Sequence, residues 1–405
     1  MLHATIVTSS KVKIGVLLLV YAAFVSMGLP DGILGAAWPQ MRAELGAGLN
    51  DNWRMLALGT CGSALSSFAS GHSLRRFGVG RVLVVTTFVT ALAILGYAHS
   101  ATLTVITALA FMLGLGNGAI DAGLNNFVAS NLSSRHMSWL HAFWGVGVSF
   151  GTLTVSGMLA AGGTWRSAYL AIGLVQVTLA LAFVSQLRQL PHAAPRAQGR
   201  EPVDHPSLSA TLRLRSSWAS MGAFFVYCGL ECSAGLWIAS ALHDGRGWTT
   251  AAAGLMATLF WASLTVGRFL IGIIAQRLRA MVIVRAAVAG ALAGTLLLAA
   301  SSAMAQTQAA TGVVTAIGLL LTGFSLSPIY PMLMHDTPRC VGEGHAMNLI
   351  GFQGGVGQLG FTLIPVAVGA LLQSQSTEWL GPLLATLVMI LVVLLALRER
   401  TELRQ

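Results

Sequence analysis

The sequence predicts an all-α membrane protein with twelve transmembrane helices arranged in two six-helix bundles. Three observations support this class. Of 405 residues, 55% are hydrophobic and only 9% are charged, apolar runs recur along the whole chain, and one polar segment divides these runs into two sets of six. Soluble domains carry about 25% charged residues. A water-soluble fold is therefore excluded.

The apolar runs set the positions of the helices, because a spanning helix needs about 20 mostly apolar residues. Runs of this kind predict spans at 13–38, 51–71, 80–98, 102–130, 138–160, 166–187, 218–242, 250–275, 281–301, 309–333, 345–372 and 379–397. Within the tenth span, Ser327 and Pro328 predict a break in the helix.

Residues 188–217 are rich in proline, arginine and serine and contain no apolar run. This composition predicts a flexible cytoplasmic linker. The expected domains are therefore residues 1–187 for the first six-helix bundle, 188–217 for the linker and 218–405 for the second bundle.

The distribution of positive charge predicts the orientation in the membrane. Of the 23 lysines and arginines, nineteen fall on the face that would hold both termini, and the other face holds Arg42, Arg54, Arg166 and Arg246. Cytoplasmic loops are enriched in such residues. We expect a multi-pass protein of a bacterial-type inner (plasma) membrane with both termini in the cytoplasm. This rule explains the net charge of +10, so no nucleic-acid partner is predicted.

Three carboxylic acids lie inside predicted spans: Asp31, Asp121 and Glu231. A charge at the centre of a spanning helix costs about 2.5–3.5 kcal/mol on the insertion scale. Acids retained at that cost typically mark a polar pathway. The long first run, which contains Asp31, is not typical of a cleavable signal peptide. The sequence therefore favours a transporter.

The sequence provides little support for an enzyme. It has no nucleophile motif, no cluster of metal ligands and no extramembrane catalytic domain, so no catalytic residue, metal or cofactor is predicted. Cys228 and Cys232 share a helix face near Glu231, which leaves a soft-metal site as a minor alternative. Buried cysteines in membrane helices mostly act as small apolar residues.

The surroundings of two acids suggest how they could work. Pro30 precedes Asp31 and lacks an amide donor, so the first span is expected to be kinked or unwound there. Asp31 and Trp38 lie on one helix face, and Asp121 and Asn125 lie on one face of the fourth span. A carboxyl group away from water favours its neutral form and can ionise when a cavity opens.

A resemblance to a known family supports this interpretation. Six spans, a central loop and six further spans resemble the major facilitator superfamily, in which two bundles enclose a central cavity. After the second span, Gly71, Arg76, Gly78 and Arg81 fit the superfamily's cytoplasmic loop motif, whereas Arg75 stands in place of its aspartate. A similar stretch that includes Arg268 follows the eighth span.

This resemblance implies an inner gate formed by Gly71, Arg75, Arg76, Gly78, Arg81 and Arg268. In the superfamily the motif's aspartate takes part in a charge interaction at this gate. Because that aspartate is absent here, other contacts must hold the gate closed. The arginines could instead serve only to orient the protein in the membrane.

A narrower resemblance involves four spans. Gly28–Leu34 and the stretch from Gly116 to Val128 are similar to the first and fourth spans of fucose–proton symporters. Leu140–Gly147 and the seventh span resemble the related sodium-dependent glucose transporter branch. Trp144 stands where the fucose symporters have an asparagine, which argues against fucose itself.

The proton-coupling candidates are Asp31 and Asp121. The expected substrate-binding residues are Asp31, Trp38, Asp121, Asn125, His141, Phe143, Trp144, Tyr227, Glu231, Trp237, Trp261 and Gln353. The aromatic residues could instead be membrane-interface anchors. Asp31 and Asp121 could instead be protonated acids that hydrogen-bond to a neighbouring helix, and His141, Glu231 and Gln353 could likewise be polar contacts between helices. Glu231 could also contribute to a sodium site.

The resulting hypothesis is a secondary active transporter that works by alternating access and takes up a monosaccharide, or a similar small polar solute, together with protons. The alternative is a proton-driven exporter of drugs or amphiphilic metabolites. The expected partners are a small-molecule substrate, a coupling ion (a proton, or sodium as the alternative) and membrane lipid. The resemblance also implies a monomer.

Overall fold

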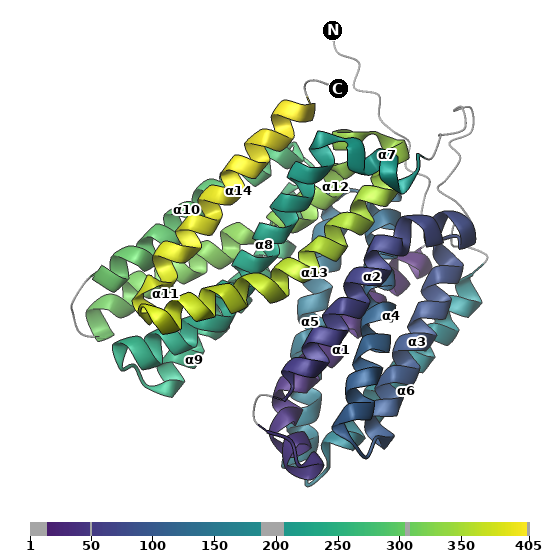
Figure 1. Cartoon of the computed structure of the whole chain (residues 1–405), viewed down its shortest axis with the longest axis horizontal. Coiled ribbons are helices and arrows are strands. Elements are labelled where there is room, and N and C mark those ends of the chain that lie inside the picture. The colour runs from purple at the N-terminus through teal and green to yellow at the C-terminus, as the bar shows by residue number, and fades with distance from the viewer. Residues whose placement is uncertain (1–13, 49–50, 188–205, 304–307, 403–405) are drawn as a thin grey trace.

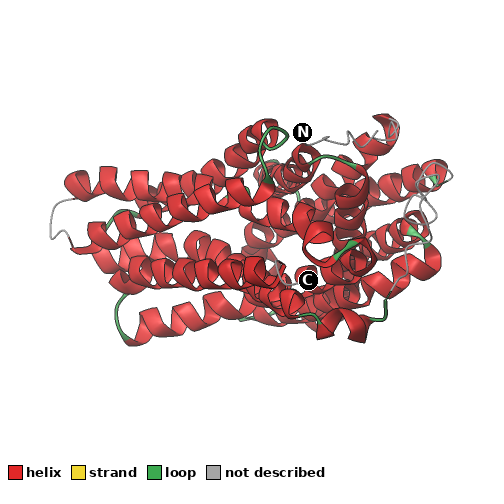
Figure 2. Ribbon diagram, turned by 90° about the horizontal axis from the view of Figure 1, so that it is seen from above, coloured by secondary structure: helices red, strands yellow, loops and turns green. Residues whose placement is uncertain are grey.

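The computed structural model describes residues 14–48, 51–187, 206–303 and 308–402, and the regular structure in these ranges is entirely helical (Figure 2). The first half of the chain contains α1 (Ile14–Leu45), α2 (Trp53–Phe77), α3 (Val79–His99), α4 (Leu103–Asn131), α5 (Ser134–Ala160) and α6 (Trp165–Gln186). The second half contains α7 (Leu208–Arg213), α8 (Arg215–Ser240), η1 (Ala241–Gly245), α9 (Thr250–Ile274), α10 (Ala280–Ala303), α11 (Gln308–Leu326), α12 (Ile329–Val341), α13 (Glu343–Ser374), η2 (Thr377–Trp379) and α14 (Leu380–Glu402).

Eleven segments of the described chain are long and apolar enough to cross a membrane. Helix α2 is the remaining long helix and is less apolar, because small polar residues and a terminal pair of arginines interrupt its sequence. With α11 and α12 counted as one span, the helices correspond to the twelve predicted spans. The predicted all-α membrane fold is confirmed.

Two local predictions had opposite outcomes. The tenth span is broken as expected: α11 ends at Leu326 and α12 begins at Ile329, with Pro328 between them. Of the two alternatives predicted at Pro30, a kinked or an unwound first span, unwinding is excluded, because α1 stays helical through Pro30 and Asp31. Gly28 and Gly32, on either side of Pro30, pack directly on the main chain of α5, and this contact supports a continuous helix.

The helices form two bundles, α1–α6 and α8–α14, that are joined through α7 (Figure 1). Helix α7 lies within the predicted linker, so part of that segment is ordered. The bundles lie close together at the end where α1 begins and α14 ends, and they diverge toward the opposite end (Figure 1). We refer to these as the terminal end and the far end.

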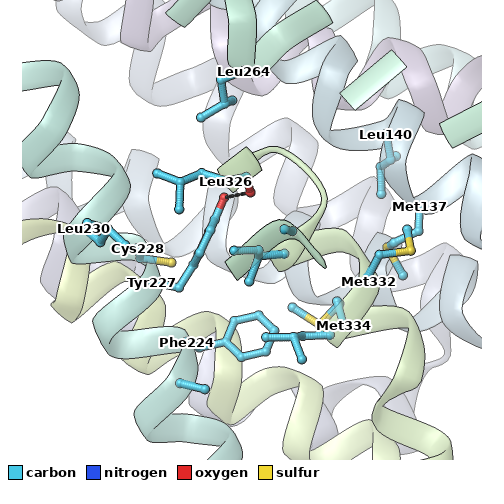
Figure 3. Packing of buried hydrophobic residues seen from close by; sticks show 14 of the residues in the cluster. Met137, Leu140, Phe224, Tyr227, Cys228, Leu230, Leu264, Leu326, Met332 and Met334 are labelled. Atoms are coloured by element: carbon cyan, nitrogen blue, oxygen red, sulfur yellow. Dashed lines mark hydrogen bonds between the residues drawn. The ribbon is translucent and has the colours of Figure 1, made fainter. Parts of the chain in front are cut away.

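Buried apolar side chains of both bundles meet near the terminal end (Figure 3). Met137 and Leu140 of α5 belong to the same buried cluster as Met332 of α12 and Phe224 and Tyr227 of α8. Such packing excludes water there. The polar side chains that cross between the bundles therefore lie in a largely dry environment.

Candidate functional site

The first contact between the bundles joins α5 to α9. Three α5 side chains donate hydrogen bonds to main-chain carbonyls of α9 and the residue that follows it: Ser134 to Ala275 at 2.9 Å, Ser138 to Arg268 at 2.6 Å, and Trp139 to Phe269 at 3.2 Å. Ala275 follows the last residue of α9, where carbonyls have no partner within the helix. The start of α5 is thereby attached to the end of α9.

The second contact joins α2 to α13 and centres on the buried Asn348. The Arg75 guanidinium donates to the Asn348 side-chain oxygen, and Gly71 packs against the same residue. The Asn348 amide group donates to Thr211 Oγ1 of α7 at 3.0 Å and to the Pro206 carbonyl at 3.1 Å. Asn348 thus links both bundles to the segment between them.

The residues of the predicted gate are distributed unevenly around these contacts. Gly71 and Arg75 lie in the α2–α13 contact, whereas Arg76 and Arg81 are exposed. Gly78 has a φ of 76° and joins α2 to α3, a conformation that suits glycine. Arg75, which stands in place of the motif's aspartate, is therefore the arginine of this loop motif that contacts the other bundle.

Asp31 is exposed although it lies within a membrane-spanning helix. Its carboxylate accepts a hydrogen bond from the Trp144 indole at 3.1 Å. Trp144 immediately precedes Gly145, where an added Cβ would lie 3.1 Å from Thr265 Oγ1 of the second bundle. The Asp31–Trp144 pair therefore lies beside the point where α5 and α9 begin to separate.

Asp121 belongs to a buried polar chain that runs from the first bundle toward the second. Its carboxylate accepts from Asn125 Nδ2 at 2.9 Å, and the Asn125 oxygen lies 3.1 Å from His141 Nε2. The donating Asn125 amide fixes which end of that side chain faces His141, so Nε2 of the imidazole carries the proton. The His141 ring stands edge-on to Tyr330 of α12 at 4.6 Å. Residues from both bundles thus meet at His141.

Glu231 forms a buried ion pair within the second bundle. Both of its carboxylate oxygens accept from Arg268 Nη2, at 3.0 and 3.1 Å, and each side chain is 6% exposed. Tyr227 also donates to Glu231, and its hydroxyl lies 3.0 Å from the Leu326 carbonyl. The negative charge of Glu231 is therefore neutralised by Arg268.

The other predicted binding residues lie apart from the Asp31–Trp144 pair, the polar chain of Asp121 and the ion pair of Glu231. Trp38 is buried in an apolar cluster of the first bundle. Phe143 packs on Tyr21 and Phe269. The Trp237 indole donates to the Pro365 carbonyl at 2.9 Å.

Two further candidates belong to the second bundle. Trp261 lies against Phe260 and Gly235. Gln353 is fully buried and uses both ends of its amide, toward Thr337 and Ser220. In this conformation Gln353 therefore connects helices of the second bundle.

Sequence reasoning missed Tyr330, which connects the Asp121 chain to the second bundle, and the buried ion pair between Asp336 and Arg398 at 2.9 Å. The signal for the ion pair was an acid near the end of the tenth span, but Arg398 was assigned only to the positive-inside pattern. In the part of the chain that the structure describes, no cluster of three or more histidine, cysteine or acidic side chains could hold a metal ion.

In the described residues, twelve spans in two bundles with polar side chains between them have the architecture of a membrane transporter. The chain belongs to the Major Facilitator Superfamily, whose family model matches residues 20–347.

Comparison with solved structures agrees with this fold. FucP in its outward conformation, a transporter of the same superfamily, is similar with a TM-score of 0.75 and 15% identity over 94% of this chain and 98% of that one. A variant of FucP, described as the E. coli fucose:proton symporter, is also similar. A bacterial homologue of the iron transporter ferroportin, in an outward-facing state, has a TM-score of 0.73 and 15% identity over 95% and 99% of the two chains.

Among curated proteins, Bypass of stop codon protein 6 of Saccharomyces cerevisiae is 24% identical over 278 residues. The match covers 63% of this chain and 56% of that relative's length.

Proposed function

We propose that this transporter takes up a monosaccharide, or a similar small polar solute, together with protons. The observation that carries the proposal is the contrast between the two acids of the first bundle. Asp31 is exposed beside the diverging helices, whereas Asp121 is 9% exposed and accepts from an amide. Among the described residues no cation forms an ion pair with either acid.

A buried acid without a cationic partner is most stable when it is protonated, because ionisation in a dry environment is costly. An exposed acid can exchange its proton with water. Movement of the bundles that changes the exposure of Asp31 or Asp121 would therefore bind or release a proton. This coupling of protonation to conformation supports both residues as proton carriers.

Glu231 has a different role in this proposal. Its carboxylate already serves as the counter-charge of the buried Arg268 guanidinium, and removal of one partner of a buried pair is costly. We therefore assign proton coupling to Asp31 and Asp121 and a structural role in the second bundle to Glu231. Neither the sodium alternative nor a direct contact between Glu231 and substrate gains support from this geometry.

The orientation proposed from the positive charges places the terminal end in the cytoplasm of a bacterial-type inner membrane. The bundles would then be closed toward the cytoplasm and open toward the outside, ready to receive solute. The similarity to FucP and to the ferroportin homologue, both in outward states, supports this view. The two bundles, divided at residues 188–217, would move as separate bodies within one monomer surrounded by lipid.

The substrate class rests on the similarity to the fucose:proton symporter and on the polar groups beside the opening. Trp144 donates to Asp31 and offers a flat apolar face on which a sugar ring could stack. The alternative, an exporter of amphiphilic compounds, relied on many aromatic residues in the cavity. Several of them, including Trp237 and Phe143, pack within the protein instead, which weakens that support.

Flux measurements in proteoliposomes test the proposal. The wild-type protein should accumulate a neutral monosaccharide from a panel when an inward proton gradient is imposed, and a sodium gradient alone should not drive uptake. At least one of Asp31→Asn and Asp121→Asn should abolish accumulation while substrate counterflow continues, because counterflow needs no net proton movement. Normal accumulation by both variants would refute the coupling assignment. Competition by lipophilic cations instead of sugars would favour the exporter.

A further inference from the structure

The segment that joins α7 to α8, residues 211–218, forms a corner that side-chain hydrogen bonds hold in place. Ser217 Oγ donates to the Thr211 carbonyl at 2.8 Å. The Trp218 indole donates to the Leu212 carbonyl, also at 2.8 Å. Both acceptors lie in the last turn of α7, where carbonyls have no partner within the helix. The two helices are therefore fixed relative to each other, and we refer to this segment as the α7–α8 corner.

One side of the α7–α8 corner packs on the second bundle. Leu212 and Leu214 lie against a buried apolar cluster that includes Phe352 of α13. Thr211 is also buried, and its Oγ1 accepts a hydrogen bond from Asn348 of α13 at 3.0 Å. This side of the corner therefore belongs to the protein interior.

The other side of the corner carries positive charge and one aromatic ring. Arg213 and Arg215 are exposed, and Trp218 is 59% exposed. Among the described residues, neither arginine forms an ion pair. Arg215 and Trp218 lie three residues apart and share one face of α8, while the carbonyl that Trp218 binds directly precedes Arg213. Two positive charges without an acidic partner in this part of the chain therefore lie close to an aromatic ring whose position is fixed.

Trp218 lies at the level where the membrane meets water. Helix α8 begins at Arg215, which is also the start of a candidate membrane span. Because a helix rises about 1.5 Å per residue, Trp218 lies about 4.5 Å further along the span than Arg215. Tryptophan is favoured at this level, since its ring is apolar while its N–H group needs a polar partner. The exposed ring is therefore placed beside lipid.

The charges of the corner favour a negatively charged lipid. The phosphate group of a phospholipid can accept hydrogen bonds from guanidinium groups. A zwitterionic headgroup also carries an ammonium group, which both arginines would repel. An anionic headgroup, such as that of phosphatidylglycerol, lacks this positive charge, and the acyl chains of such a lipid can lie on Trp218. The corner therefore matches an anionic phospholipid in both charge and depth.

We propose that the α7–α8 corner binds one anionic phospholipid through Arg213, Arg215 and Trp218, and that the bound lipid holds α7 against α13. The inference goes beyond the proposed function and depends neither on the substrate nor on proton coupling.

The bound lipid would act on the terminal end through Asn348. Asn348 donates to Thr211 of the corner and accepts from Arg75 of α2. The contact between α2 and α13 therefore shares a residue with the attachment of α7. A ligand stabilises the conformation to which it binds, so a lipid that fixes the corner also stabilises the closed terminal end.

Quenching of Trp218 fluorescence by brominated lipid tests the site. The protein is placed in nanodiscs of equimolar phosphatidylcholine and phosphatidylglycerol, in which one lipid or the other carries brominated acyl chains. The signal of Trp218 is the difference between each protein and its own Trp218→Phe counterpart. Without a preference for one headgroup, both kinds of nanodisc quench this signal equally, because the brominated chains are the same.

In the wild-type protein, brominated phosphatidylglycerol should quench Trp218 at least about threefold more strongly than brominated phosphatidylcholine. The corner variant, Arg213→Gln with Arg215→Gln, should lose this difference. The control variant is Arg277→Gln with Arg279→Gln, because these arginines are also exposed, are also separated by one residue, and lie at the terminal end between α9 and α10. The control variant should retain the full difference.

Three outcomes would overturn the lipid site. The first is equal quenching by the two lipids in the wild-type protein. The second is an equal loss of the difference in the corner and control variants, because it would mean that the anionic surface attracts the protein as a whole. The third concerns inorganic phosphate, which should leave the quenching unchanged when it is added to the buffer. If phosphate abolished the difference, the corner would bind a free anion instead of a lipid.

A second test follows the closure of the terminal end. Ser70 of α2 is buried beside Gly351 of α13, so a cysteine introduced there should react only when this contact opens. The four native cysteines are first replaced by serine. An uncharged, water-soluble maleimide should react at least about threefold more slowly in the mixed nanodiscs than in nanodiscs of phosphatidylcholine alone.

The corner variant should lose this difference in rate, and the control variant should keep it. Equal rates for the wild-type protein in both kinds of nanodisc would overturn the role of the lipid in holding α7. Because neither test uses a substrate or a proton gradient, their failure is distinguishable from failure of the proposed transport function.

Discussion

The ion pair between Glu231 and Arg268 leads to a quantitative prediction about stability. Each side chain is only 6% exposed, and two hydrogen bonds of 3.0 and 3.1 Å join them. Glu231→Gln keeps the shape of the side chain but removes its charge. The buried guanidinium then lacks a counter-charge, which in proteins costs about 3–5 kcal/mol.

The surroundings of Arg268 place the expected effect in this range. Its Nε atom already lacks a hydrogen-bond partner among the described residues, so the lost bonds have no evident replacement. Its main-chain carbonyl also accepts from Ser138 of the other bundle. Displacement of Arg268 would therefore also weaken the α5–α9 contact.

A double substitution separates charge imbalance from loss of packing. With both Glu231→Met and Arg268→Met, neither charge of this pair remains, and Tyr227 can still donate to the Leu326 carbonyl at 3.0 Å. The double variant should be more stable than Glu231→Met or Arg268→Met alone, with a coupling free energy of at least about 2 kcal/mol. Replacement of a whole buried pair by apolar residues is often close to neutral.

Equilibrium unfolding in mixed micelles of a mild detergent and SDS measures these free energies for the wild-type protein, Glu231→Gln, both methionine single variants and the double variant. If Glu231→Gln is as stable as the wild type, Glu231 is not the counter-charge of Arg268. If the double variant loses the sum of the two single losses, the side chains act independently, and the reasoning fails.

Two further predictions concern the ends of the molecule. Arg75→Ala removes a charged donor to Asn348, and a hydrogen bond of this kind is worth about 1.5–3 kcal/mol. A cysteine introduced at the buried Ser70 reports on the α2–α13 contact, and in the Arg75→Ala variant it should react with a water-soluble maleimide at least about tenfold faster. An unchanged rate would mean that this bond does not hold the terminal end closed. At the far end, beyond the membrane-spanning part of α1, hydrogen bonds, first of all from the Trp165 indole, hold the pKa of Glu44 below its ordinary value of 4.5. The ionised form of Glu44 therefore stabilises the fold above that pH, by at most about 1 kcal/mol because the side chain is partly exposed. This stabilisation is lost as the pH falls through the folded-state pKa, and Glu44→Gln should abolish it. Identical pH profiles of unfolding for the wild type and Glu44→Gln would contradict this.

The sequence was sufficient to predict the helices because backbone groups in lipid must bond within their own helix, which makes each span a long apolar run. Contacts within one helix could also be read from spacing: Asp121 and Asn125 lie four residues apart, and the structure joins them at 2.9 Å. Helix α7 could not be predicted this way. Its six residues are too few for a periodic pattern.

Partners on different helices could not be predicted from the sequence. Trp144 lies 113 positions from Asp31, and Asn348 lies 273 positions from Arg75. Such pairs depend on which helix faces meet and at what height, and hydrophobicity alone does not determine either. The continuous helix at Pro30 was missed for the same reason, since the packing of α5 on Gly28 and Gly32 is a contact between distant segments.

The strengths of the polar contacts differ systematically within and between the bundles. All the ion pairs among the described residues join side chains of the same bundle. The contacts between α5 and α9 are hydrogen bonds without an ionic pair, such as Ser134 to Ala275 and Gln276 to Ser133. Across α2 and α13, Arg75 reaches a neutral amide, and Thr60 meets Thr362 at 3.1 Å.

This difference is what a rocking mechanism requires. A hydrogen bond contributes about 0.5–1.5 kcal/mol net, so the few bonds between the bundles together contribute several kcal/mol. A shift from 1:99 to 99:1 between two conformations needs about 5.5 kcal/mol, which is of the same order. Ion pairs across the interface would make the closed terminal end harder to open, whereas ion pairs inside each bundle keep it rigid during the movement. Arg75 in place of the motif's aspartate fits this division, because its partner across the interface is an amide and the bond can be broken without leaving a buried counter-charge unpaired.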